Sequence, residues 1–110
     1  MNPGALNRKI EIQEDQSQGE TNENGYAVAS WATVARPWAS VEAVSGTEKV
    51  SAGGLIAKAS LKFRIRYRPE ITAQHRVVYA GKPMNIVFVD DERQAHKYQV
   101  LYCEVQDDGS

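Results

Sequence analysis

Four basic side chains recur at every second position of one short stretch, and they are the residues best placed to bind a ligand. They are Lys62, Arg64, Arg66 and Arg68. On a β-strand they would share one face at intervals of about 6.6 Å, close to the spacing of successive phosphates along a nucleic-acid strand. Such a stripe can contact a phosphate backbone whatever its sequence. Pairing with Glu11 or Glu42 on neighbouring strands, or solvation alone, would account for the same pattern.

Other residue types that could do chemistry are few and scattered. His75 and His96 fall in separate expected turns, and Cys103 falls in a strand that is expected to point it inward. No pair has zinc-finger spacing, and no stretch matches a nucleophile elbow, a P-loop, a dinucleotide fingerprint or a calcium loop. Glu42 and Glu48 are a candidate carboxylate pair without an identifiable acid, base or oxyanion partner. We therefore expect no enzyme activity, no metal and no cofactor.

The element that carries the four basic residues is a strand. They alternate with Leu61, Phe63, Ile65 and Tyr67, which predicts a half-buried strand with one apolar face. A helix would spread both sets around its circumference and leave no apolar face. Pro69 should end the strand, because proline has no amide hydrogen to donate to a ladder.

Further stretches predict strands on the same grounds. Residues 8–13, 38–44, 76–79, 84–89 and 98–105 have strand patterns, and 26–34 is either a short strand or an ordered arm. A loop of about four residues, 80–83, should join two of them as a hairpin. No convincing helix interrupts the series. The sequence therefore predicts an all-β fold, a single-domain barrel or sandwich of about six short strands over residues 1–110.

Two long loops are expected in this fold. Residues 14–25 are rich in polar side chains, cannot bury enough apolar surface to order themselves, and predict a mobile loop after the first strand. Residues 45–59 follow the second confident strand and have no sustained period. Loops of this length without secondary structure are usually functional or disordered. The second loop is also apolar for a loop in water, so we expect it to find a partner outside its own domain. A flexible tail is expected at 106–110.

Local signals in the second loop limit what it can form. Ser45 and Glu48 match a capping box, the start signal of a helix. Gly53 and Gly54 follow closely and would end any helix after about a turn.

Composition excludes several classes of protein. The net charge of −1 argues against a free-standing nucleic-acid binder, which is usually basic overall. The single cysteine excludes an internal disulfide framework. No apolar run reaches the roughly 20 residues that span a bilayer, and residues 1–4 lack the pattern of a signal peptide. We expect a protein that stays in a cytoplasm and does not contact a membrane.

An ordered series of short features covers nearly the whole chain. It contains Gly4, Leu6, Arg8, Ile10, Ile12, Gly25, Trp31, Trp38, Ala39, Val41, Glu42, Gly46, Glu48, Arg66, Tyr67, Gly81, Ile86, Leu101, Cys103 and Glu104. In this order they resemble the phage head-tail joining, or head-closure, proteins. The chain departs from the usual pattern at Met84, where an aromatic residue is common, and at Gly53-Gly54.

The resemblance implies a structural protein of the virion connector. Members of this family are small β-barrels that form a ring below the portal or its adaptor after DNA packaging, close the head and dock the tail. It implies as partners the portal or adaptor, a tail or tail-terminator protein, further copies of the chain, and packaged DNA without sequence preference. No small-molecule substrate is implied.

The resemblance also assigns a role to the second loop. In relatives this loop projects into the central channel and helps to close it. The residues that correspond to it here are Gly46, Glu48, Lys49, Val50, Gly53, Gly54, Leu55, Ile56 and Lys58. We expect an isolated monomer in which residues 45–59 are mobile and become ordered on assembly. The alternative is a small nucleic-acid-binding barrel that uses the four basic residues as phosphate contacts.

Overall fold

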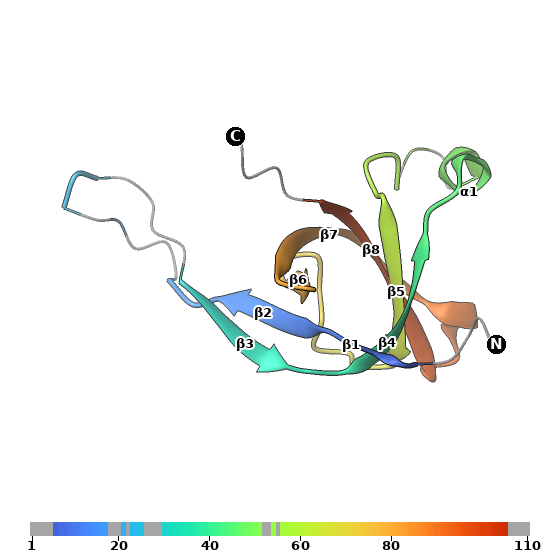
Figure 1. The fold of residues 1–110 in the computed structure, drawn as a ribbon, viewed down its shortest axis with the longest axis horizontal. Helices are drawn as coiled ribbons and strands as arrows, with labels where there is room; N and C mark the ends of the chain where they lie inside the picture. The colour runs from blue at the N-terminus through green and yellow to red at the C-terminus, as the bar shows by residue number, and fades with distance from the viewer. Residues whose placement is uncertain are drawn as a thin grey trace.

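The computed structural model describes residues 6–17, 21, 23–25, 30–51, 54 and 56–105. Within them it contains eight β-strands, one α-helix and one 3-10 helix (Figure 1). The strands are β1 (Arg8–Lys9), β2 (Glu11–Asp15), β3 (Trp31–Ala35), β4 (Trp38–Ala43), β5 (Leu61–Arg66), β6 (Arg76–Tyr79), β7 (Lys82–Asp91) and β8 (Tyr98–Val105). The helices are α1 (Gly46–Ser51) and the 3-10 helix η1 (Glu92–Gln94).

The strands form one antiparallel series in the order β1-β4-β5-β8-β7-β6-β2-β3. Only Ile10 separates β1 from β2, and only Arg36 and Pro37 separate β3 from β4. The amide of Ile10 donates to the carbonyl of Pro37 at 3.1 Å, which links the two breaks. When β1 and β2 are counted as one interrupted strand, and β3 and β4 as another, the fold has six strands. The expected all-β fold of about six strands is confirmed.

The first strand curls the sheet. Its β1 part pairs with β4 and its β2 part pairs with β6, so this one stretch of chain contacts both ends of the β4-β5-β8-β7-β6 series. The sheet therefore bends round on itself like a small barrel (Figure 1). The β2–β3 hairpin continues beyond this contact and extends away from the rest of the sheet.

The core lies inside this curled sheet. It comprises Ile10, Ile12, Ala39, Phe63, Ile65, Ile71, Val77, Met84, Ile86, Leu101 and Cys103. The expected alternation of β5 is confirmed at its centre, because Phe63 and Ile65 are fully buried, and the inward direction of Cys103 is confirmed as well. Met84 is 3% exposed, so a flexible unbranched side chain fills its place in the core.

The hairpin between β6 and β7 is tighter than expected. A loop of about four residues was predicted at 80–83, but Tyr79 pairs with Lys82 and Val78 with Pro83. The loop is therefore only Ala80 and Gly81, both at positive φ, 53° and 80°. Two central residues at positive φ give a turn whose twist matches that of the flanking strands.

Several expected boundaries move. The strand predicted over 84–89 runs from Lys82 to Asp91 and is followed directly by η1. The strand or arm predicted at 26–34 is strand β3 from Trp31, and residues 26–29 lie outside the described residues. Likewise β2 runs through Asp15, into the expected loop at 14–25. The mobility expected of that loop stays a prediction, and the tail 106–110 lies outside the described residues.

The Phe63→Ala variant should be the most damaging single truncation of β5. Phe63 is fully buried, and its ring meets that of Tyr79 edge to face, with centroids 5.5 Å apart. Loss of a buried phenyl ring typically costs about 3–5 kcal/mol, a large part of the stability of a small domain. Urea unfolding followed by circular dichroism measures the loss.

Phe88→Ala is the matched control for this measurement. The ring of Phe88 is only partly buried and contacts Tyr102 with centroids 6.2 Å apart. Its truncation should cost less than half as much as that of Phe63. Equal losses in the two variants would contradict the placement of the core on the inner face of β5.

Candidate functional site

The segment expected to act in assembly begins with a capped helix. The amide of Glu48 donates to Ser45 Oγ at 3.0 Å, and the amide of Ser45 donates back to Glu48 Oε1 at 3.4 Å. This reciprocal pair satisfies two amides at the start of α1. The capping box predicted from the sequence is therefore confirmed, and the helix ends at Ser51 after 6 residues. The structure corrects the expectation that 45–59 has no secondary structure.

One lysine ties this helix to the barrel. Lys62 Nζ on β5 lies 2.9 Å from both carboxylate oxygens of Glu48 and 3.8 Å from Glu42 Oε2. The hydrogen bond from Lys62 lowers the pKa of the Glu48 carboxyl. Burial disfavours the charge on Lys62, but its hydrogen bond and charge attraction to Glu48 prevail, so the pKa of Lys62 is raised. The contact is therefore strongest while both groups are charged.

The other end of the segment is fixed by backbone hydrogen bonds. The amide of Ser60 donates to the carbonyl of Cys103 on β8 at 2.8 Å, and the amide of Val44 donates to the carbonyl of Ser60 at 3.1 Å. Ile56 and Ala59 are buried. The segment therefore starts and ends at one end of the curled sheet, and α1 lies beyond the ends of β4 and β5 (Figure 1).

The structure places only part of the expected channel-loop set. Gly46, Gly54 and Lys58 are exposed, Lys49 is half-buried and Ile56 is buried. Gly54 has a φ of +89°, a conformation that favours glycine. Gly53 and Leu55 lie outside the described residues, and the side chain of Val50 does too.

The structure divides the basic stripe into two halves. Arg64 forms two hydrogen bonds with the carboxylate of Glu92, at 2.8 and 3.1 Å, and stacks on the ring of Tyr98 at 3.9 Å. With Lys62 held by Glu48, the first two basic residues are bound to carboxylates. Pairing with Glu11 or Glu42 was the alternative explanation of the stripe, and the structure shows the pairing with Glu42, between Lys62 Nζ and Glu42 Oε2 at 3.8 Å.

Glu11 pairs elsewhere because of the register. It lies on β2 opposite Val78 of β6, whereas the stripe lies on β5, between β4 and β8. Its carboxylate accepts a hydrogen bond from Arg36 Nε at 3.2 Å.

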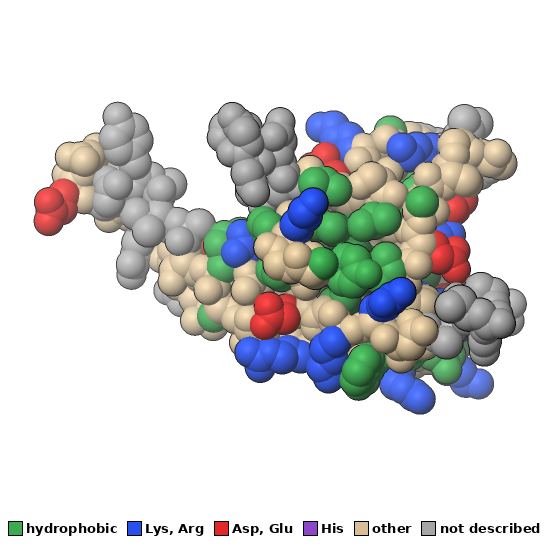
Figure 2. Space-filling model, viewed as in Figure 1, with side chains coloured by type: hydrophobic (Ala, Val, Ile, Leu, Met, Phe, Trp, Pro, Cys, Tyr) green, Lys and Arg blue, Asp and Glu red, His purple; other side chains and the backbone are tan. Residues whose placement is uncertain are grey.

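The other half of the stripe lies beside residues from β1, from the start of β4 and from the short segments that precede these two strands. Arg66 and Arg68 line a hollow of about 270 Å³ together with Leu6, Lys9, Arg36, Pro37 and Trp38. We call these seven residues the basic patch. Lys9 Nζ sits 4.8 Å from the centre of the Trp38 ring, and Trp38 is 53% exposed. Figure 2 shows Lys and Arg side chains gathered along the edge of the molecule where β1 and β4 lie in Figure 1.

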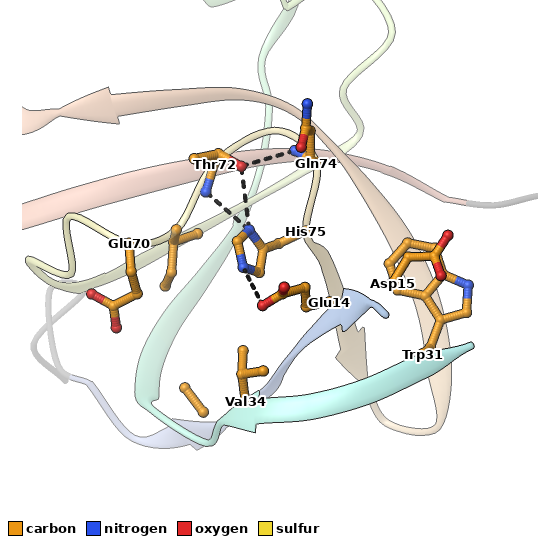
Figure 3. A pocket seen from close by; sticks show the side chains of 10 residues that line it. Glu14, Asp15, Trp31, Val34, Glu70, Thr72, Gln74 and His75 are labelled. Atoms are coloured by element: carbon orange, nitrogen blue, oxygen red, sulfur yellow. Dashed lines mark hydrogen bonds and ion pairs between the residues drawn. The ribbon is translucent and has the colours of Figure 1, made fainter. Parts of the chain in front are cut away.

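A second hollow, of about 740 Å³, opens between β3 and the connection from β5 to β6 (Figure 3). We call it the acidic groove. Its lining residues are Glu14, Asp15, Trp31, Val34, Ala35, Glu70, Ile71, Thr72, Gln74 and His75. It contains three carboxylates and no lysine or arginine. Val34 is 44% exposed and is the extra residue of a β-bulge, since Ile12 pairs with Ala35 and Gln13 with Thr33.

His75 points into the acidic groove. Its Nδ1 accepts a hydrogen bond from the Thr72 amide at 3.2 Å, which leaves Nε2 to carry the proton of the neutral ring. Nε2 faces Glu14 Oε2 at 3.7 Å (Figure 3). Sequence reasoning missed both the groove and most of the patch, because their residues come from segments that are distant in sequence.

Other candidate chemistry finds little support. Burial raises the pKa of the Cys103 thiol to about 12, so the thiol stays protonated and unreactive. Among the described residues, no three His, Cys, Asp or Glu side chains come together as metal ligands. None of the described helices is long and apolar enough to cross a membrane.

Residues 1–106 match the model of a protein family described as phage head completion protein. The chain belongs to this family. The resemblance read from the sequence is thereby confirmed. The family consists of structural proteins of the phage head and is not an enzyme family, so this head completion protein is a component of the virion.

Two solved structures are similar to this head completion protein. One is the solution structure of protein SF1141 from Shigella flexneri 2a, with a TM-score of 0.77 and 29% identity over 98% of this chain and 99% of that one. The other is a chain from the virion of a native gene transfer agent particle, with a TM-score of 0.59 and 22% identity over 88% of this chain and 91% of that one. The second likeness concerns the fold alone. A comparison with curated proteins gave no match.

Glu48→Gln should loosen α1 from the barrel. The variant keeps the size of the side chain but removes the charge that holds Lys62. A partly exposed ion pair is worth about 0.2–1 kcal/mol, so amide exchange at Lys49, whose N–H donates to the Ser45 carbonyl, should accelerate up to about 5-fold. Glu42→Gln is the control, because its carboxylate is more distant and 49% exposed. Equal acceleration in both variants would contradict the role of the Glu48–Lys62 ion pair in holding α1 against the barrel.

The lowered pKa of the Glu48 carboxyl sets the direction in which pH changes the strength of the Glu48–Lys62 contact. The contact stabilises the folded chain above the ordinary carboxyl pKa of about 4.3 and is lost as the pH falls through the lowered value. Protection of α1 in the unsubstituted protein should therefore decrease on acidification, once intrinsic exchange rates are divided out.

Proposed function

We propose that this head completion protein assembles as a ring below the portal or its adaptor after DNA packaging, closes the head, retains the DNA and provides a surface on which the tail docks. The partners in this proposal are the portal or adaptor, a tail or tail-terminator protein, neighbouring copies of the chain, and packaged DNA. Membership of the head completion family supports the role at the head.

The observation that carries the proposal is the attachment of residues 45–60. The segment leaves β4 and returns to β5 at one end of the sheet, where Lys62 and the Ser60 amide hold its two ends. Its exposed described residues include Gly46, Gly54 and Lys58. A segment attached to the barrel at both ends, with exposed residues between the attachments, can reach the axis of a ring without disturbing the barrel.

Neighbouring copies supply what the single chain lacks. Fixing some 15 residues costs on the order of 15–30 kcal/mol of backbone entropy, which we expect the Lys62–Glu48 contact and the burial of Ile56 and Ala59 to offset only in part. In a closed ring each copy of the segment would meet its neighbours. We therefore propose that residues 45–59 become fully ordered only on assembly.

The alternative function, nucleic-acid binding through the basic stripe, has less support from the structure than from the sequence alone. It requires four free cations along the basic stripe, whereas Lys62 and Arg64 are bound to Glu48 and Glu92. Arg68 also pairs with Glu70, at 3.6 Å. A stripe with three of its four cations paired with carboxylates would release fewer counterions and bind a phosphate backbone less tightly. In the ring, contact with packaged DNA would come from many copies and not from one strong site.

Particles of the phage that encodes this chain test the proposal. Quantitative mass spectrometry of complete particles, and of DNA-filled heads that lack tails, should find the chain in both at one constant low ratio to the portal protein. This result is expected because the ring is added before the tail. Absence from both would contradict the proposal and return attention to salt-dependent binding of DNA and RNA by the free chain.

Hydrogen exchange tests the ordering of the segment. In the free chain, amides of residues 46–58 should exchange far faster than those of β5 and β8, and they should become protected in DNA-filled heads. The amide of Ser60 serves as an internal reference, because its hydrogen bond to Cys103 belongs to the barrel. Slow exchange throughout 46–58 in the free chain would rule out ordering on assembly.

A further inference from the structure

We propose that the acidic groove of one copy binds the basic patch of a second copy of this chain. The proposal deepens the ring assembly proposed above and rests on it for its biological role, although the contact itself can be tested without phage particles. It assigns a partner to two surfaces that the channel segment does not use.

The two surfaces have opposite charge. The groove contributes the carboxylates of Glu14, Asp15 and Glu70 without any lysine or arginine. The patch contributes Lys9, Arg36, Arg66 and Arg68. Arg36 and Arg68 pair with Glu11 and Glu70 of the same chain, so among the described residues Lys9 and Arg66 are the patch cations without an ion pair. The whole chain has a net charge of only −1, so this separation is a matter of placement and not of composition. Surfaces of opposite potential attract and orient one another during encounter.

The two surfaces also share an apolar component. Among the described residues, the exposed large hydrophobic side chains are Val34, Trp38 and Val105. Val34 lies in the groove and Trp38 in the patch. An exposed tryptophan with basic neighbours is the type of side chain that anchors interfaces. The groove has apolar walls at Val34, Ala35 and Ile71 that can receive it.

The available groups in the groove are those with the fewest internal contacts. Glu14 and Glu70 have side chains 52% and 59% exposed, with single partners at 3.7 and 3.6 Å, His75 and Arg68. Asp15 differs, because its Oδ1 accepts the amides of Ser17 and Ser30 and so holds the base of the hairpin. On the patch, Arg66 is exposed and has no ion pair with any described residue, whereas Arg36 already pairs with Glu11. Glu14, Glu70, Lys9 and Arg66 are therefore the residues to change.

A second copy of the chain can bind both the acidic groove and the basic patch, whereas a polyanion can bind only the basic patch. DNA or an acidic protein could cover the patch but would be repelled by the groove. A basic peptide would do the reverse. A second copy carries the complement of each surface, and in a head-to-tail arrangement every copy uses both, as a closed ring requires.

Charge exchange gives a test with internal controls. The groove variant carries Glu14→Lys and Glu70→Lys, the patch variant carries Lys9→Glu and Arg66→Glu, and a third protein carries all four substitutions. Lys82→Glu with Lys97→Glu matches the charge change of the patch variant at exposed positions outside both surfaces and outside the channel segment. Circular dichroism verifies the fold, and sedimentation velocity at rising concentration measures self-association.

The unsubstituted chain should be monomeric at micromolar concentration and should associate with a Kd of about 0.1–1 mM, weakening as salt is added. The groove variant and the patch variant should each associate at least about 10-fold more weakly. An equimolar mixture of the two, and the protein with all four substitutions, should recover to within about 3-fold of the unsubstituted chain. The mixture recovers because each groove then meets a patch of opposite sign, and recovery also shows that both variants are folded.

Three results would overturn the inference. The first is a chain that stays monomeric at millimolar concentration. The second is a groove or patch variant that associates as well as the unsubstituted chain. The third is a mixture that fails to recover while the Lys82→Glu, Lys97→Glu control associates normally. These results leave the proposed function standing, since that fails only if the chain is absent from particles. If a variant does not fold, Glu14→Gln with Glu70→Gln replaces the groove variant and should weaken association about 3-fold or more.

Discussion

The rest of the structure depends on the alternation of side chains along β5. The strand lies between β4 and β8 and places Phe63 and Ile65 wholly inside the curled sheet. Because successive side chains point to opposite faces, burial of that pair fixes the outward direction of Lys62, Arg64 and Arg66. A shift of one residue in register would bring arginine into the core, at a cost that no contact there could offset.

The outward cations in turn determine what can pack against the outside of the barrel. Lys62 donates a hydrogen bond to the carboxylate of Glu48 in the first turn of α1. Arg64 donates to the carboxylate of Glu92 in η1, which follows β7. Both helices are too short to be stable alone. Their positions therefore depend on charges set by a neighbouring strand. The basic stripe supports local structure through Lys62 and Arg64, whereas Arg68 pairs with Glu70 and Arg66 has no ion pair with any described residue.

Much of the fold could be predicted from local pattern. The period of two along β5, the capping box at Ser45 and Glu48, and the turn signal at Gly81 each depend on residues within a few positions of one another. What the pattern could not give is pairing between distant segments. The break at Ile10 and Pro37 depends on a hydrogen bond across 27 positions of sequence, and it is this break that lets the first strand contact both ends of the sheet. The bounds of β7 were likewise set by its partners and not by its own composition.

The same limit explains why the candidate surfaces were found only in part. The stripe was visible because strand geometry alone puts its residues on one face. The groove combines β2, β3 and the 70–75 connection, and the patch combines β1, β4 and the end of β5. Neither has a local signature. In sequence, Arg66 and Arg68 belong to one stripe with Lys62 and Arg64, but in space they belong with Lys9 and Trp38. A charge pattern along a strand therefore indicates which side chains point outward, while the acids carried by neighbouring elements decide which of those side chains stay free to bind a partner.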